Sequence, residues 1–93
     1  WTDERPTVYN LSQNYPNPFN PTTVIEYSIK NDELVNLTVY DILGKTVAHA
    51  VNNFQKAGTY KVNFDAADLA SGIYFYEIRS GGFYDVKKMI LIR

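Results

Sequence analysis

The stretch SGIYFYEIRSGGFYDVKKMILIR, residues 71–93, predicts two β-strands joined by a tight turn. The expected strands are Ile73–Arg79 and Phe83–Ile92, both rich in the β-branched and aromatic residues that suit a pleated, half-buried surface. Between them lies Gly81-Gly82, a pair typical of two-residue hairpin turns because glycine accepts positive φ. This end of the chain is therefore expected to form an antiparallel hairpin.

The second strand of this hairpin ends in Met89-Ile90-Leu91-Ile92, which is apolar on both faces. Strands with two apolar faces are usually buried on both sides, and an exposed strand of this composition would promote aggregation. We therefore expect this strand to be central in a sheet or covered. We also expect the domain to end with it, with only Arg93 beyond.

Further strands are expected before this hairpin, because apolar and polar residues alternate there with the period of a half-buried strand. They cover Thr23–Ile29, Val35–Tyr40, Val47–Val51 and Tyr60–Phe64, and the alternation is weakest in the third. Gly44 interrupts the chain between the second and the third and predicts a hairpin with a positive φ. Residues 65–70 are expected to form one helical turn at most.

The spacing of these strands predicts an all-β fold. The strands recur about every ten residues, with glycine between them, as in sandwiches of antiparallel sheets. A chain of 93 residues, 45% hydrophobic and 15% aromatic, has room for one such domain with a small core, and not for two. No helix of useful length, internal repeat or low-complexity tract is expected.

A proline-rich segment, Tyr15–Pro21, precedes the first long strand. Pro16, Pro18 and Pro21 remove three backbone donors and favour extended conformations. Asn-Pro, a pair that initiates turns, occurs twice. We expect a rigid, shaped loop that is neither strand nor helix.

The chain starts at Trp1 rather than at a methionine, which indicates a piece of a longer protein. The polar residues 1–8 are expected to link the domain, residues 9–93, to an upstream cargo. No apolar run has the length of a signal peptide or a membrane span. If the parent protein is exported, its signal is expected to lie outside this sequence.

Composition and charge exclude several classes of partner. The formal net charge is −1, from 9 lysines and arginines against 10 aspartates and glutamates. A charge this small supplies no strong field for binding nucleic acid or acidic lipid. The absence of cysteine excludes disulfides and thiolate metal sites.

Residues that could carry catalysis or bind a metal are few. The single histidine, His49, falls in an expected strand with no partner at a suitable spacing, so we interpret it as a tolerated position on an edge or partly exposed strand. Asp41, Asp65 and Asp68 are candidate ligands of a loop-bound calcium ion, but no D-x-D-x-D pattern is present. We favour turn and capping roles for Asp65 and Asp68. No metal or cofactor is expected, and an enzyme is the least favoured class.

Two short motifs admit a binding role beside a structural one. In Tyr74-Phe75-Tyr76, Tyr74 and Tyr76 share one face of a strand and could stack on a sugar, but we favour a place in the core. Lys87 and Lys88 point to opposite faces of the last strand, so one must lie toward a buried side or at the border of a sheet. A solvated edge and a recognition role for this pair are weighed equally.

Five motifs in a fixed order give the sequence a resemblance to a known family. The chain from Tyr9 to Arg93 resembles the type A C-terminal sorting domain of the type IX secretion system of Bacteroidetes and related phyla. It is also similar to the immunoglobulin-like domain of flagellar hook-capping proteins. The motifs that carry the resemblance are Tyr15–Thr23, Val39–Lys45, Ala57–Tyr60, Leu69–Tyr76 and Lys87–Leu91.

The resemblance implies an immunoglobulin-like antiparallel β-sandwich of about seven strands. It also implies that the domain is an address for cargo in the same chain. Such cargo crosses the inner membrane with its own signal, and the folded domain is then recognised in the periplasm and directs the cargo through the outer-membrane translocon. A sortase-like peptidase usually removes the domain, and the cargo is released or attached to the cell surface. A monomeric domain without catalytic activity is expected.

The motifs of the family carry over to positions that are expected to serve sorting or recognition. We interpret the glycines as turn-forming, the proline segment as a rigid docking surface, and the lysines as charged contacts at the rim of an interface. Two other functions stay open: a structural assembly domain, and a carbohydrate-associated accessory domain of a surface protein or secreted enzyme. The carried-over residues are Asn17, Pro18, Asp41, Gly44, Lys45, Gly58, Tyr60, Gly72, Tyr74, Lys87 and Lys88.

Overall fold

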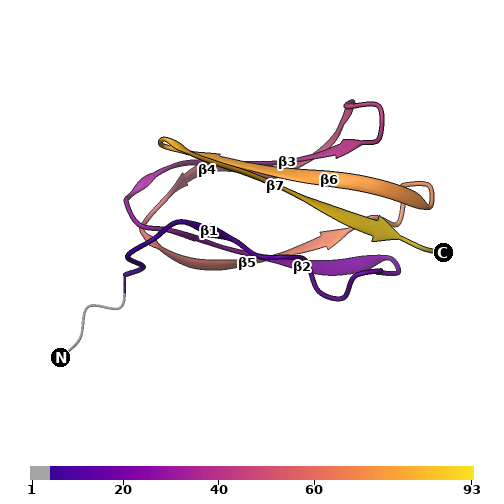
Figure 1. Cartoon of the computed structure of the whole chain (residues 1–93), viewed down its shortest axis with the longest axis horizontal. Coiled ribbons are helices and arrows are strands. Elements are labelled where there is room, and N and C mark those ends of the chain that lie inside the picture. The colour runs from indigo at the N-terminus through magenta and orange to yellow at the C-terminus, as the bar shows by residue number, and fades with distance from the viewer. Residues whose placement is uncertain (1–4) are drawn as a thin grey trace.

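The computed structural model of the chain describes residues 5–93, and they form a sandwich of two antiparallel β-sheets (Figure 1). Trp1 and the rest of the first half of the expected linker, residues 1–4, lie outside the described residues. The three-stranded sheet has the order β1-β2-β5, with β1 at Asn10–Leu11, β2 at Thr22–Ile29 and β5 at Gly58–Asp65. The four-stranded sheet has the order β4-β3-β6-β7, with β4 at Thr46–Gln55, β3 at Glu33–Asp41, β6 at Gly72–Ser80 and β7 at Phe83–Leu91.

The expected all-β fold and its strands are confirmed, and the main difference is the length of β4. Val47–Val51 was expected, but the strand continues to Gln55, where it pairs with Glu33 of β3. Two register shifts in the β3–β4 ladder break the alternation of β4. Its second half lies at an edge of the sheet and carries the exposed Phe54, so few apolar side chains there point inward.

The core lies between the sheets and is built from the alternating positions of the strands. In β2, side chains at every second position are buried while those between them are partly exposed. The same alternation places Tyr76 and Ile78 of β6 fully inside, opposite the three-stranded sheet. The largest side chains of the core are therefore aromatic and aliphatic, and they include Tyr27, Tyr76, Phe19, Ile25, Ile29, Leu37, Ile78, Met89 and Leu91.

A buried tyrosine closes the connection between the two sheets. Tyr74, at the start of β6, donates a hydrogen bond from its hydroxyl to the carbonyl of Ala70, at 2.6 Å. A tyrosine at this corner that bonds a few residues upstream is typical of immunoglobulin-like sandwiches. The segment before it forms a turn in which the Leu69 amide donates to the Ala66 carbonyl at 3.0 Å, in keeping with the expectation of at most one helical turn.

The glycine pair between β6 and β7 forms the expected two-residue hairpin. Ser80 pairs with Phe83 across it, and Gly81 has a φ of +57°, a region that side chains rarely adopt. A Cβ atom at Gly81 would also meet the carboxylate of Glu33, which is the end of a flexible side chain and can move aside. The positive φ is therefore what favours glycine at this position. No helix in residues 5–93 is long and apolar enough to span a membrane.

Replacing Tyr74 by phenylalanine tests the corner. We expect Tyr74→Phe to lower the free energy of unfolding by about 1–2 kcal/mol, because the carbonyl of Ala70 loses its donor. Denaturation in urea measures this change. Tyr15→Phe is the control, since Tyr15 is 80% exposed, and it should change stability by less than about 0.5 kcal/mol. Equal stability of the two variants would contradict the structural role of the corner.

Candidate functional site

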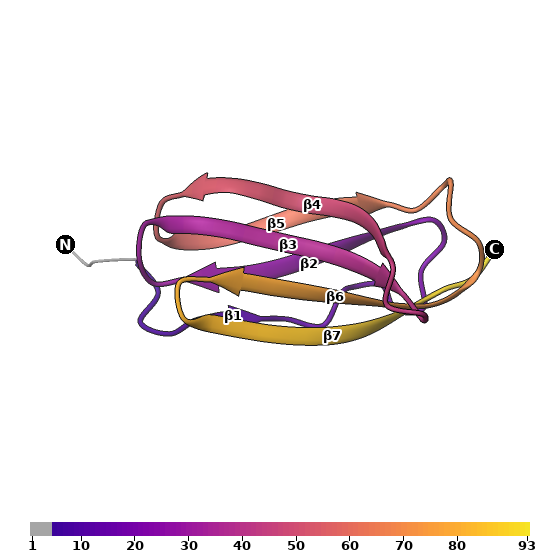
Figure 2. The same cartoon turned by 90° about the horizontal axis from the view of Figure 1, so that it is seen from above.

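One end of the sandwich gathers most of the motif segments, although they lie far apart in the sequence. Gly72 pairs with Leu91, and Asp41 pairs with Tyr74 two residues further along β6. Phe19 of the proline segment forms a bridge with Leu91. Figure 2 shows the segment before β2, the β3–β4 turn and the β5–β6 loop at the end where the C-terminus lies, opposite the β6–β7 turn.

The proline segment covers the free edge of β7 at this end. The Phe19 amide donates to the Ile90 carbonyl at 2.9 Å, and the Ile92 amide donates back to the Phe19 carbonyl at 3.0 Å. The Ile90 amide donates to Oδ1 of Asn17 at 2.9 Å, and the ring of Phe19 is buried in the core. The last strand is therefore an edge strand with a cover, which decides between the two expectations for it.

The segment that leads into the prolines is fixed to the opposite sheet by Tyr76. Its hydroxyl donates to the Ser12 carbonyl and accepts from the Asn14 amide, both at 2.7 Å. The side chain of Asn14, which is buried, donates to Thr23 Oγ1 at 3.0 Å and to the Pro16 carbonyl at 3.1 Å. Pro16, Pro18 and Pro21 all follow cis peptide bonds. The segment forms isolated bridges with no strand of its own, as expected.

Sequence reasoning missed Asn14 and Thr23. A buried amide and hydroxyl that bond each other satisfy groups that would otherwise be costly in the core. The available signal was Thr23, because it shares the inward phase of β2 with the apolar residues that follow it, Ile25 and Tyr27.

The β3–β4 turn is held by the side chain of Asp41. Its Oδ1 accepts hydrogen bonds from the amides of Leu43 and Lys45, both at 2.9 Å. The Gly44 amide donates to the Asp41 carbonyl at 3.0 Å, and Gly44 has a φ of +84°, as the sequence predicted. The Asp41 carboxylate therefore stabilises the turn through hydrogen bonds to its backbone amides.

The favoured turn role for the other loop aspartates is confirmed for one of them. Oδ1 of Asp65 accepts from the Ala67 amide at 2.9 Å, whereas Asp68 is exposed. No group of three or more histidine, aspartate or glutamate side chains in residues 5–93 is placed to hold a metal ion. His49 is exposed on the edge strand β4, which matches its expected place.

The lysines of the motifs face solvent at different places. Lys45 is exposed beside the β3–β4 turn, and Lys88 is exposed opposite Phe75 on the outer face of the four-stranded sheet. Lys87 is half-buried opposite Tyr76 on the inner side of the edge strand, so the expectation of a border position is confirmed. Arg93 lies at the same end and donates to the carbonyls of Leu69 at 2.5 Å and Ala67 at 2.6 Å.

Two carried-over positions lie at the opposite end of the sandwich. Gly58 begins β5, and the hydroxyl of Tyr60 donates to the Lys56 carbonyl at 2.5 Å. The ring of Tyr60 stacks on Tyr27, with 5.5 Å between centroids. Both residues lie at the β4–β5 connection, remote from the proline segment. The expected core place of Tyr74 and Tyr76 is confirmed, which removes them as a sugar-stacking platform.

A polar network on the outer face of the four-stranded sheet was not predicted. Nε of Arg79 donates to Glu77 at 2.8 Å, the Tyr40 hydroxyl donates to Glu77 at 3.3 Å, and the guanidinium lies 4.7 Å from the Tyr84 ring centroid. Burial alone would raise the pKa of Glu77, but the hydrogen bonds from Arg79, Tyr84 and Tyr40 outweigh it and lower that pKa. The residues come from three strands, so no local pattern revealed them.

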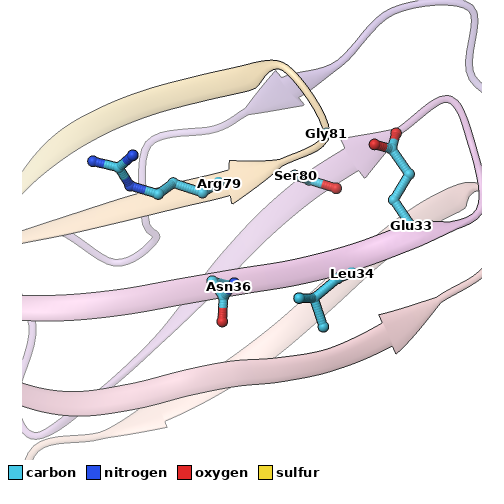
Figure 3. Close-up of a pocket in the computed structure, with 6 residues that line it drawn as sticks. All are labelled: Glu33, Leu34, Asn36, Arg79, Ser80 and Gly81. Carbon is cyan, nitrogen blue, oxygen red and sulfur yellow. The ribbon is translucent and has the colours of Figure 1, made fainter.

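A shallow hollow of about 340 Å³ lies beside this network, near the β6–β7 turn (Figure 3). Figure 3 shows the Arg79 side chain pointing away from Glu33, so the two charges do not converge on one point. Ser80 Oγ is buried there without a hydrogen-bond partner among the described residues. The hollow is lined by Glu33, Leu34, Asn36, Arg79, Ser80 and Gly81.

Comparison with known proteins identifies the family. The family model described as "Secretion system C-terminal sorting domain" matches residues 13–93, nearly the whole chain. The chain belongs to this family and is a C-terminal sorting signal for type IX secretion, which implies export toward the cell surface or the extracellular space. The resemblance seen in the sequence is thus confirmed. No curated protein and no solved structure matches the chain.

Exchange of amide protons tests the cover of β7. We expect Asn17→Ala to make the amide proton of Ile90 exchange roughly five- to ten-fold faster, because that proton loses its acceptor. Hydrogen exchange followed by NMR measures the rate. The matched control is Asn20→Ala, an exposed asparagine of the same segment, which should leave Ile90 unchanged. Similar rates in both variants would contradict the contact.

Alkaline pH tests the burial of the core tyrosines. Burial raises the pKa of Tyr76 and of Tyr27 to about 12, from an ordinary value near 10. The unfolded chain therefore loses these protons first as pH rises, so the stability they contribute is complete below pH 10 and falls between about pH 10 and 12. Between pH 10 and 12, the melting temperature of the unsubstituted chain should fall more steeply with pH than that of the Tyr27→Phe variant. Parallel curves would contradict the burial effect.

Proposed function

We propose that the domain is read in its folded state, at the end of the sandwich that carries the proline segment, the β3–β4 turn and the end of β7. The observation that carries this proposal is the convergence of those three segments around the first residues of β6. There Tyr74 pairs with Asp41, and Gly72 pairs with Leu91, which also forms a bridge with Phe19. A receptor that contacts all of them at once binds the native fold and not the unfolded chain. Its contacts then verify that the domain has folded.

The carried-over residues divide into two groups under this proposal. The first group maintains the fold through turns, hydrogen bonds and the core, and two of its members, Gly58 and Tyr60, do so at the opposite end of the sandwich. This group is Asn17, Asp41, Gly44, Gly58, Tyr60, Gly72 and Tyr74. The second group supplies contacts to the receptor, because these side chains are exposed or lie at the border of β7: Pro18, Lys45, Lys87 and Lys88. The lysines act at the rim, where charge contributes to encounter and specificity more than to affinity.

The proposal extends to the protein that contains this domain. Residues 1–8 link it to upstream cargo, and residues 9–93 are the sorting domain, which works as a monomer without catalysis or cofactor. The cargo passes through the periplasm, and the partners are the type IX translocon and a sortase-like peptidase. Membership of the sorting family supports a cargo protein and a secretion machinery as partners.

Export of a reporter tests the proposal. The whole chain is fused to the C-terminus of a periplasmic reporter in a host with a type IX system, and external and periplasmic reporter are measured. We expect export, and we expect Lys45→Ala combined with Lys88→Ala to reduce it several-fold without lowering the melting temperature, because both side chains are exposed.

The control for charge is Lys56→Ala combined with Lys61→Ala, which removes two exposed lysines elsewhere in the chain. That variant should be exported like the unsubstituted fusion. A reporter that stays in the periplasm although the unsubstituted domain is folded overturns the sorting proposal. Equal export of both lysine variants overturns the assignment of the contact lysines alone.

A further inference from the structure

The tip of the β3–β4 turn presents two large aliphatic side chains to solvent. Ile42 is 67% exposed and Leu43 is 89% exposed, so neither is part of the core. Turns are usually occupied by glycine, proline, asparagine, aspartate or serine, each for a conformational reason. Isoleucine and leucine have no such reason to occupy a turn, and their exposure is unfavourable in water.

The turn does not need these side chains to form. Asp41 Oδ1 accepts the amides of Leu43 and Lys45, and Gly44 takes the positive φ. Only the backbone of Leu43 takes part in these bonds. The turn would therefore close equally well with polar residues at 42 and 43, and its apolar character must have another origin.

The tip is both fixed and accessible. Its base continues into β3, where Asp41 pairs with Tyr74 of the central strand β6. Figure 1 shows the β3–β4 hairpin bending away from the three-stranded sheet, so that its tip stands clear of the sandwich at the C-terminal end. A side chain held on such a turn loses little further freedom on binding, which favours its use as an anchor.

We propose that Ile42 and Leu43 form an apolar knob that inserts into an apolar pocket of a protein receptor. The inference rests on the proposed sorting function. In it, Asp41 and Gly44 form the turn that holds the knob in place, and the knob rather than these two residues contacts the receptor. The exposed Lys45 next to the knob fits a pocket with an acidic rim.

A protein pocket fits the tip better than a lipid surface does. Attachment to anionic lipid relies on clusters of basic residues. Here the net charge of the whole chain is −1, and Lys45 is the single basic residue of the turn 41–45. Two aliphatic side chains on a narrow tip match a pocket in size, and a protein pocket can bury both of them.

The test uses the reporter fused to the whole chain, with Ile42→Asn and Leu43→Asn combined. We expect export to fall roughly ten-fold or more, because an interface loses its central anchors. The melting temperature should not fall, since both side chains are exposed. A second variant with the conservative changes Ile42→Val and Leu43→Met keeps both side chains apolar and should be exported like the unsubstituted fusion.

The matched control is Leu34→Asn combined with Phe54→Asn. These residues pair across β3 and β4 away from the tip and are 53% and 64% exposed. This variant should be exported normally. Equal export of the knob variant and the unsubstituted fusion overturns the knob while the sorting proposal stands, whereas an unsubstituted fusion that stays periplasmic overturns both.

Two further outcomes would overturn the protein pocket. Co-sedimentation of the unsubstituted chain with phosphatidylethanolamine–phosphatidylglycerol vesicles, lost in the knob variant, would assign the tip to a membrane. Dimerisation in analytical ultracentrifugation that the knob variant abolishes would assign it to a second copy of the chain.

Discussion

The unpaired edge of β7 is the constraint on which the arrangement of this domain depends. β7 pairs with β6 on one side, and an open edge of such apolar composition would recruit other strands. The proline segment removes this hazard by bonding Ile90 and Ile92 through Phe19 and Asn17. Because that segment must then lie along β7, its position is determined by the strand it protects. The buried hydroxyl of Tyr76 fixes where the segment begins.

This arrangement connects folding with sorting. The segments that gather at the C-terminal end come from the first, middle and last parts of the chain, and only the closed sandwich brings them together. Most residues of the family motifs are engaged in turns or hydrogen bonds within the domain, as Asp41 and Asn17 illustrate. Their side chains are therefore occupied, and the groups left for a partner are the exposed ones beside them. The motif residues of this domain therefore more often hold the surface in shape than contact a partner themselves.

Much of the fold could be predicted because strands and tight turns leave local signals. Alternation identified β2, β3 and β5, and Gly44 and Gly81-Gly82 identified the two hairpins. β4 was predicted too short, since its bulges and its edge position break the alternation. The contacts of Tyr40 and Tyr84 with the Glu77–Arg79 pair and the Asn14–Thr23 bond were not predicted, because their members come from different strands or segments.

The sequence by itself determined the all-β class, the inward phase of the strands, the turns and the sorting family, because each depends on residues close together in the chain or on their order. Tertiary structure alone decided that β7 is an edge strand covered by the proline segment. It also decided that the motif segments share one end, and that Ile42 and Leu43 are left exposed on a turn that does not require them. These features depend on which distant segments become neighbours, and alternation along a strand specifies a buried face without specifying the neighbour that buries it.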